Sequence, residues 1–308
     1  MNSTAEAAAL IPVGWREWVS RLPADGGPSG ADWAAGLPRL LADLLADWAL
    51  TPTGGGMTGW TAVVVPVTRD GEDLVLKLVW PHPEAAAEPL ALRHWAGDGA
   101  VRLVAADPSR GGLLLEALDA SHDLETTTID IDSACETVGG LLERLHVPAP
   151  PRLRRLSDVV AEQVGRLQDA HDRLPRRFIE RATHLAADLT GQPDCDDTLL
   201  HTDLHFGNVL AGRREPWLAI DPKPLAGHPG WELQPVLRNR VDELGSGSSF
   251  RYLVRRRFKI VCEAAGIDED AARAWTILNS VIQANWSSLD GEPDHVTLHL
   301  ALAKALEG

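Results

Sequence analysis

The sequence predicts an α+β protein of two lobes, a small antiparallel sheet followed by a larger, mostly helical part. Alternating apolar residues typical of strands are concentrated in the first third of the 308-residue chain. Helical periodicity dominates from about residue 132 and is interrupted by a short hairpin pattern near residue 210. We therefore place an N-lobe at residues 1–115 and a C-lobe at residues 116–308.

The predicted N-lobe begins with an irregular segment and a helix. Residues 1–30 mix Pro, Gly, Ser and Trp, and we expect them to wrap loosely around the domain. Leucines at helical spacing predict a helix over residues 36–49. After a glycine-rich break, two alternating apolar stretches on either side of a polar Arg-Asp-Gly-Glu turn predict a β-hairpin. The hairpin strands, the next helix and two further strands are expected at residues 60–67, 74–79, 84–96, 101–105 and 112–116.

The predicted C-lobe is helical apart from its middle. A short apolar stretch at residues 198–200 leads into the polar stretch His-Thr-Asp-Leu-His-Phe-Gly-Asn. Two short strands at residues 209–210 and 217–220 then flank a polar turn and form a hairpin. Helices are expected at residues 132–146, 156–173, 176–190, 231–244, 249–264, 270–287 and 293–306.

Composition and charge restrict the possible partners. The formal net charge of −15 opposes binding to nucleic acid and attracts a cationic small molecule, although charge alone indicates only solubility. The three cysteines form no Cys-x-x-Cys pair, which argues against a disulfide framework or a cysteine zinc site. No apolar run approaches the ~20 residues that span a bilayer. We expect a cytoplasmic protein with no membrane contact and no obligate protein partner.

The most informative stretch is residues 199–224, where three polar residues have a spacing suited to phosphoryl transfer. Asp203 precedes Asn208 by five positions, and Asp221 follows Asn208 by thirteen. The hairpin between Asn208 and Asp221 would bring these two side by side, with Asp203 on the loop before them. An amide oxygen and a carboxylate suit Mg²⁺ as ligands, and a separate carboxylate can orient a hydroxyl and take its proton. We predict Asp203 as the base and Asn208 and Asp221 as the metal ligands.

The same stretch permits a different site. His201, Asp203 and His205 form a His-x-Asp-x-His pattern that could bind the metal of a metal-dependent hydrolase. That alternative leaves Asn208 and Asp221 unexplained. Under the phosphoryl-transfer interpretation, His201 and His205 are structural residues that pack and hydrogen-bond within the loop.

The order and spacing of these residues resemble a known family. Asp203-x-x-x-x-Asn208 followed by Asp221 is similar to the catalytic loop and metal-binding aspartate of the protein-kinase superfamily. His201-x-Asp203-Leu-His-x-x-Asn208 with Asp221-Pro-Lys-Pro resembles the aminoglycoside/hydroxyurea kinases, a branch of the aminoglycoside phosphotransferases, from about residue 30 to the end. The resemblance implies a protein-kinase-like fold and transfer of phosphate from ATP, with Mg²⁺, to a hydroxyl of an aminoglycoside antibiotic such as streptomycin. Such a modification would confer resistance.

The resemblance also assigns nucleotide-binding residues in the N-lobe. Lys77, a single charge in an apolar strand, would reach the α- and β-phosphates of ATP. Its expected partner is a glutamate on the next helix, for which spacing favours Glu88 over Glu84 although Pro89 follows Glu88 directly. The glycine-rich loop would cover the phosphates, and the hinge between the lobes would bind the adenine edge. These two groups comprise Gly54, Gly55 and Gly56 in the loop, and Glu116, Ala117 and Leu118 in the hinge.

The same signature fits more than one acceptor. A kinase for another small molecule, such as hydroxyurea or a metabolic sugar or amino alcohol, has the same signature. A non-enzymatic scaffold would not need Lys77, Asp203, Asn208 and Asp221 together. The acids available to bind a cationic acceptor, and the tryptophans able to stack on a sugar if they are not core residues, are Glu232, Asp242, Glu243, Asp290, Glu292, Asp294, Trp231 and Trp286.

Overall fold

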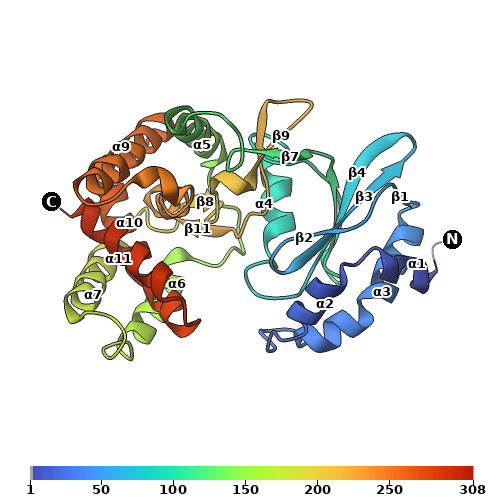
Figure 1. The fold of residues 1–308 in the computed structure, drawn as a ribbon, viewed down its shortest axis with the longest axis horizontal. Coiled ribbons are helices and arrows are strands. Elements are labelled where there is room, and N and C mark those ends of the chain that lie inside the picture. The colour runs from blue at the N-terminus through green and yellow to red at the C-terminus, as the bar shows by residue number, and fades with distance from the viewer. Residues whose placement is uncertain (1–2, 308) are drawn as a thin grey trace. The chain divides into compact units, whose positions relative to one another are not determined.

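The computed structural model describes residues 3–307 and divides the chain into two compact units. The boundary lies between Leu118 and Asp119, close to the predicted boundary after residue 115. The N-terminal unit contains the larger sheet, and the C-terminal unit is mostly helical (Figure 1). No helix within residues 3–307 combines the length and the apolar character that a membrane span requires.

The sheet of the N-terminal unit is antiparallel throughout. Its strand order is β1-β3-β4-β6-β5, and β2 pairs with β3 outside this path. The predicted hairpin is its central pair, in which Val64 lies opposite Lys77. The strand bounds are β1 Thr51–Pro52, β2 Met57–Thr58, β3 Ala62–Arg69, β4 Glu72–Val79, β5 Leu103–Asp107 and β6 Gly112–Glu116.

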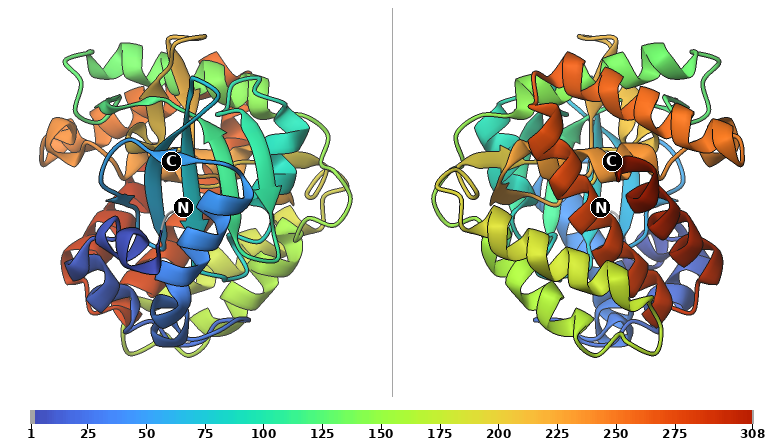
Figure 2. Two further views of the ribbon diagram at one scale, coloured as in Figure 1. Left: turned by 90° about the vertical axis from the view of Figure 1, so that its right-hand side faces the viewer. Right: turned by 90° about the vertical axis from the view of Figure 1, so that its left-hand side faces the viewer.

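Helix α3 (Gly30–Asp47) lies across one face of this sheet (Figure 2) and provides much of its core. Its leucines repeat at helical spacing, so that Leu37, Leu41 and Leu44 are fully buried together with the inward side chains of β3 and β4. Helix α4 (Glu88–Trp95) packs beside β5 and begins later than the predicted residue 84. A turn occupies the intervening residues because Pro89 is compatible only with the first turn of a helix.

The expectation that residues 1–30 wrap loosely is wrong for residues 3–30; residues 1–2 lie outside the described part of the chain. Residues 3–30 contain two short helices, α1 (Thr4–Ala9) and α2 (Val13–Val19), that pack against α3. The start of α1 is a capping box, in which the Ser3 hydroxyl accepts from the Glu6 amide and the Glu6 carboxylate accepts from the Ser3 amide. The Ser-x-x-Glu spacing was visible in the sequence and was the signal for this helix.

The C-terminal unit surrounds the long helix α10 (Glu269–Leu289) with other helices. Both α7 and α11 pack on α10, and α5 packs on α9. The bounds of these surrounding helices are α5 Ile131–Leu145, α6 Leu156–Leu167, α7 Arg176–Thr190, α9 Ser248–Ala265 and α11 Pro293–Leu306. They agree with the predicted helices to within a few residues, except that α6 ends at Leu167 rather than at residue 173.

Two small sheets lie in the middle of this unit. One has the order β10-β9-β7, and the other pairs β11 with β8. Strands β9 and β10 were predicted, and β8 coincides with the apolar stretch at residues 198–200, whereas the short strands β7 and β11 were not predicted, because neither shows the alternation of a half-buried strand. The bounds are β7 Asp119–Asp123, β8 Thr198–Leu200, β9 Val209–Ala211, β10 Trp217–Ala219 and β11 Leu225–Gly227.

The predicted helix over residues 231–244 is broken into three pieces. A 3-10 turn at Pro229–Glu232 precedes helix α8 (Leu233–Leu237), and a second 3-10 turn follows at Val241–Leu244. The break falls at Arg240, whose φ of +48° is incompatible with a continuing right-handed helix. The Arg257 guanidinium holds this turn by donating to the carbonyl oxygens of Asn239 and Arg240. The interruption therefore depends on a contact that helical periodicity does not report.

Candidate active site

The hairpin of β9 and β10 brings Asn208 and Asp221 together, as predicted. Val209 lies opposite Ala219 in the antiparallel register, and the Ile220 amide donates to the Asn208 carbonyl oxygen at 2.9 Å. Asp221 follows Ile220 directly, so it leaves the hairpin beside Asn208. The chain turns sharply here, because Asp221 has a φ of +57°, in the left-handed region that aspartate tolerates better than most residues.

Asn208 connects this hairpin end to the loop that carries Asp203. Its side-chain amide nitrogen donates to the Asp203 carbonyl oxygen at 2.8 Å, and both residues are buried. With the nitrogen engaged, the amide oxygen remains as a ligand atom. An amide oxygen and the Asp221 carboxylate fit Mg²⁺, which usually takes one or two protein oxygens and completes its shell with phosphate and water.

The Asp203 carboxylate is held by two cations. The Lys223 ammonium donates to Oδ2 at 2.6 Å, and the Arg238 guanidinium donates to Oδ1 at 2.8 Å. Burial by itself would raise the pKa of Asp203, but the charges of Lys223 and Arg238 outweigh it and place the pKa below its ordinary value. Asp203 is therefore ionised at neutral pH. It can accept a hydrogen bond from an acceptor hydroxyl, but it is a weak proton acceptor.

Sequence reasoning missed the roles of these two cations. Lys223 lies within the Asp-Pro-Lys-Pro segment and was noticed there only as part of a resemblance. Arg238 is one of many arginines in the chain and lies 35 positions from its partner. Only the folded chain brings them to the same carboxylate.

A buried glutamate holds the main chain of the loop that carries Asp203. The Glu232 carboxylate accepts from the His201 amide at 2.5 Å and from the Thr202 amide at 2.8 Å. Thr202 has a φ of +62°, and its hydroxyl donates to the Lys223 carbonyl oxygen at 2.6 Å. Because Glu232 is fully buried and engaged with main-chain amides, it supports the loop and is not available to bind an acceptor, contrary to one sequence expectation.

The two histidines of the loop are structural. The His201 ring contacts main-chain atoms with both nitrogens, Nε2 with the Ile220 carbonyl oxygen and Nδ1 with the Asp203 amide. His205 Nδ1 accepts from the Gly207 amide at 3.1 Å. Within residues 3–307, no group of three or more His, Cys, Asp or Glu side chains is arranged to hold a metal ion. The hydrolase alternative therefore lacks a metal centre in the described part of the chain.

In the N-terminal unit, Lys77 and Glu88 form a buried ion pair. The Lys77 ammonium donates to both carboxylate oxygens of Glu88, at 2.6 and 2.8 Å. Their side chains are only 7% and 2% exposed. Glu88 is the first residue of α4, and Pro89 occupies the second position, where its missing amide is not needed. The expected pairing of Lys77 with Glu88, rather than with Glu84, is thus present.

The glycine-rich loop is bound by the N-terminal helices. The Gly56 amide donates to the Leu10 carbonyl oxygen at 2.9 Å, and a Cβ added to Gly56 would overlap that oxygen. The Trp15 indole donates to the Gly59 carbonyl oxygen at 2.9 Å. Gly56 is therefore required for close approach to the segment after α1. The amides of Gly54 and Gly55 have no hydrogen-bond partner within residues 3–307.

The hinge residues follow β6. The Glu116 amide donates to the Arg102 carbonyl oxygen at 3.0 Å, and the Glu116 carboxylate accepts from the Arg102 amide at 2.7 Å. Within residues 3–307, the main chain of Ala117 and Leu118 has no hydrogen-bond partner. These two residues therefore offer main-chain donors and acceptors of the kind that binds an adenine edge.

The remaining candidates do not form an acceptor site. Trp231 is buried and packs edge-to-face on Trp275 with 5.9 Å between ring centroids, so it is a core residue. Trp286 is partly exposed, and the Arg166 guanidinium lies 5.0 Å from its ring centroid. The acids that lie exposed on the surface of this unit are Asp242, Glu243, Asp290, Glu292 and Asp294.

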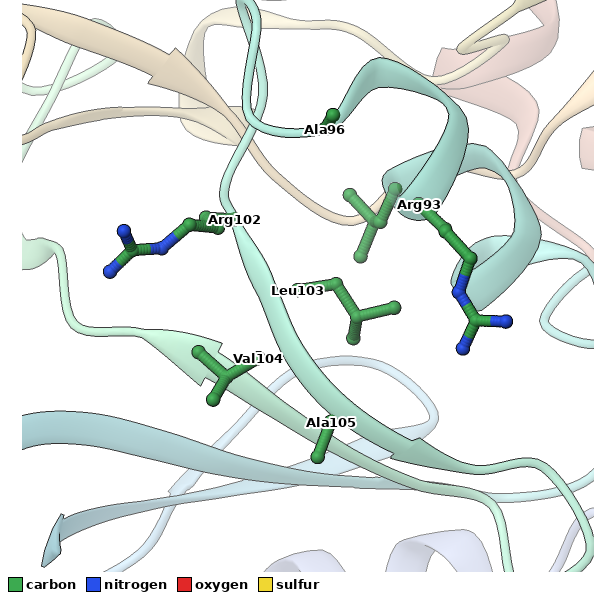
Figure 3. Close-up of a pocket in the computed structure, with 7 residues that line it drawn as sticks. Arg93, Ala96, Arg102, Leu103, Val104 and Ala105 are labelled. Atoms are coloured by element: carbon green, nitrogen blue, oxygen red, sulfur yellow. The ribbon is translucent and has the colours of Figure 1, made fainter.

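A pocket of about 300 Å³ lies between α4 and β5 in the N-terminal unit (Figure 3). Apolar side chains such as Leu103 and Val104 line it, and the side chains of Arg93 and Arg102 point away from one another at its sides. None of the predicted site residues contributes to this pocket. It has no convergent set of polar groups, so we assign it no role in the reaction.

Comparison with known proteins relates the chain to a family of kinases. The profile of a family described as aminoglycoside/hydroxyurea antibiotic resistance kinase matches residues 47–291. The chain is 44% identical to a hydroxyurea phosphotransferase of Kitasatospora aureofaciens, with 92% of this chain and 82% of that protein covered. It is 43% identical to a streptomycin 6-kinase of Streptomyces glaucescens, with 92% and 93% covered, and 40% identical to a streptomycin 6-kinase of Streptomyces griseus, with 96% of each covered.

Solved structures confirm the predicted fold class. A choline/ethanolamine kinase family protein from Mesorhizobium loti is similar with a TM-score of 0.60 and 15% identity, covering 87% of this chain and 94% of that one. A thermostable mutant of the aminoglycoside phosphotransferase APH(4)-Ia, in a ternary complex with ADP and hygromycin B, is similar with a TM-score of 0.56 and 14% identity, covering 86% of this chain and 96% of that one. At these identities the likeness concerns the fold alone.

Proposed function

We propose that this chain, which belongs to the aminoglycoside/hydroxyurea antibiotic resistance kinase family, transfers the γ-phosphoryl group of ATP to a hydroxyl of streptomycin or a similar aminoglycoside. The observation that carries the proposal is the meeting of Asp203, Asn208 and Asp221 at the end of one hairpin. Phosphoryl transfer needs charge and position more than covalent chemistry, and these three residues supply both.

Asp203 would act on the acceptor. Its ionised carboxylate accepts a hydrogen bond from the attacking hydroxyl and orients the oxygen towards the γ-phosphorus. As the new oxygen–phosphorus bond forms, the bond from phosphorus to the β,γ-bridging oxygen breaks and ADP leaves with the electron pair. The hydroxyl proton passes to Asp203. Because its low pKa makes Asp203 a weak base, we infer that the proton moves late and that orientation is its larger contribution.

Asn208 and Asp221 would hold Mg²⁺ through the amide oxygen and the carboxylate. When bound, the ion neutralises charge on the β- and γ-phosphate oxygens. The bond from the Asn208 side-chain nitrogen to the Asp203 carbonyl oxygen, 2.8 Å long, ties the metal ligand to the loop of the base. A shift of one would therefore move the other.

The N-terminal unit would bind the nucleotide. Lys77 would contact the α- and β-phosphates, and Glu88 would hold its ammonium in place. The amides of Gly54 and Gly55 would meet phosphate oxygens, and the main chain of Ala117 and Leu118 would bind the adenine edge. Because ATP is abundant in the cytoplasm, we propose that the enzyme acts there.

Hydroxyurea is the second candidate acceptor. The relative named for it is 44% identical to this chain, against 43% for a streptomycin 6-kinase, so identity does not separate the two. Phosphorylation of either compound attaches a bulky dianion to it, which would spoil its fit to its target and confer resistance.

The test is turnover of ATP by the full chain with streptomycin, hydroxyurea, other aminoglycosides and choline offered separately, with product masses recorded. We expect a phosphate-sized mass gain on streptomycin that requires Mg²⁺ and falls by about 10²–10⁴-fold in Asp203→Asn. Gain on hydroxyurea alone would replace the acceptor and keep the mechanism. Gain on no compound, together with no ATP binding by calorimetry, would end the proposal.

A further inference from the structure

Both oxygens of the Asp203 carboxylate are occupied before any acceptor arrives. Arg238 lies on Oδ1 at 2.8 Å and Lys223 on Oδ2 at 2.6 Å. The Asp203 side chain is 12% exposed, whereas those of Lys223 and Arg238 are 38% and 36% exposed. The two cations are thus more accessible to solvent than the carboxylate that they contact.

The main chain of Lys223 is fixed. The residue lies between Pro222 and Pro224, which restrict its backbone, and its amide donates to the His201 carbonyl oxygen at 2.9 Å. Its carbonyl oxygen accepts from the Thr202 hydroxyl at 2.6 Å. Lys223 is therefore fastened to the loop of Asp203 on both sides, and it also lies two positions after Asp221.

Arg238 is held differently. It caps the end of α8, and its guanidinium has no hydrogen bond to any side chain within residues 3–307 other than Asp203. The Arg257 guanidinium anchors the next carbonyl oxygen, that of Asn239, at 2.6 Å. The main chain is thus anchored, while the long Arg238 side chain can leave Asp203 by rotating its own torsions. A partly exposed ion pair is screened by water, so a polar ligand can displace it.

We propose that Arg238 blocks the Asp203 carboxylate until an acceptor binds, a role that we call a guard. It occupies the carboxylate in the acceptor-free enzyme and yields to the acceptor hydroxyl, whereas Lys223 stays and positions the carboxylate. This inference rests on the proposed function, because it assumes that Asp203 acts on the attacking oxygen. While Arg238 is in place, its guanidinium takes one acceptor position of Oδ1 and obstructs a water molecule that approaches this oxygen, so ATP is protected from hydrolysis.

The side reaction that the guard suppresses is hydrolysis of ATP by water. A water oxygen forms a bond to the γ-phosphorus, the bond to the β,γ-bridging oxygen breaks, and ADP leaves with the electron pair. The proton of the water passes to Asp203 and then to solvent. The products are ADP and inorganic phosphate, with no acceptor consumed.

The experiment measures ADP formed per acceptor phosphorylated, in the full chain with ATP and Mg²⁺, using streptomycin and hydroxyurea as acceptors. In Arg238→Met, we expect acceptor-independent ADP formation to rise about tenfold, a part of what a positioned base contributes. Lys223→Met is the matched control, because it removes the other cation of the same carboxylate. We expect it to lower transfer and hydrolysis together, leaving their ratio unchanged. Arg238→Lys keeps the charge and should restore the low ratio.

The outcomes separate the guard from the proposed function. An unchanged ratio in Arg238→Met, with transfer retained, would overturn the guard and leave the kinase intact. If the ratio of ADP formed to acceptor phosphorylated rises equally in Lys223→Met, the distinction between the two cations is overturned. If the wild-type chain phosphorylates neither acceptor nor any other compound, the proposed function fails and the guard fails with it. Should Arg238→Met not fold, as judged by thermal melting, Arg238→Gln carries the same test.

Discussion

Substituting Glu88 by glutamine will remove the carboxylate charge that pairs with the buried Lys77 ammonium. The Lys77 ammonium is 2.6 and 2.8 Å from the two Glu88 oxygens, and the side chains are 7% and 2% exposed. Breaking a buried pair of this kind by removing one partner costs about 3–5 kcal/mol, because the remaining charge stays desolvated. We expect Glu88→Gln to lower the free energy of unfolding by about 3 kcal/mol, towards the lower end of that range, because glutamine still offers one oxygen.

A double-mutant cycle makes the reasoning testable. Lys77→Met alone should also cost about 3 kcal/mol, since it removes the cation that pairs with the buried Glu88 carboxylate, whereas Lys77→Met combined with Glu88→Leu should cost much less than the sum of the two single losses. The assay is urea unfolding followed by fluorescence and circular dichroism, with ATP affinity measured separately by calorimetry. The argument is refuted if the losses in free energy of unfolding of the two single variants add in the double variant, or if Glu88→Gln loses less than about 1 kcal/mol. Either result would show that the pair is solvated.

Three further predictions follow from buried groups and from the N-terminal helices. Burial raises the pKa of the thiols of Cys135, Cys195 and Cys262 to about 12. A thiol reagent at pH 8 should therefore label none of the three in the folded protein and all of them in denaturant. Rapid labelling of the native protein would contradict this. Burial lowers the pKa of His299 from 6.5 to about 4, so between these values the unfolded chain binds a proton that the folded chain does not. Stability should therefore fall as pH drops from 6.5 to 4, by about 3 kcal/mol in total, and urea unfolding of His299→Gln across this range should show a shallower fall. Trp15→Phe removes the indole donor to the Gly59 carbonyl oxygen, so the KM for ATP should rise about threefold while the KM for the acceptor stays constant; an equal change in both would contradict a role at the nucleotide loop.

Much of the fold was predictable because its signals are local. The leucines of α3 repeat at helical spacing, and β3 and β4 alternate around a turn. The positions of Asp203, Asn208 and Asp221 followed from one hairpin, whose register sets which residues meet at its end. These elements depend on neighbours a few positions apart, and the sequence states such neighbours directly.

Other elements were missed although they are equally short. Strand β7 has exposed residues along most of its length and no alternation, so its pairing with β9 is decided by the partner strand. The break after α8 follows from the contact of Arg257 with the turn at Arg240. In both cases the deciding residue lies on another element, which periodicity within a segment cannot report.

The sequence by itself determined the fold class, the family resemblance and the order of the catalytic residues. The tertiary structure decided what surrounds them. Glu232 reaches the His201 amide across 31 positions, Arg238 reaches Asp203 across 35, and Trp15 reaches Gly59 across 44. Each of these residues is an unremarkable acid, base or aromatic in the linear chain. Their roles arise because burial and hydrogen bonding depend on distances in space, which only the folded chain defines.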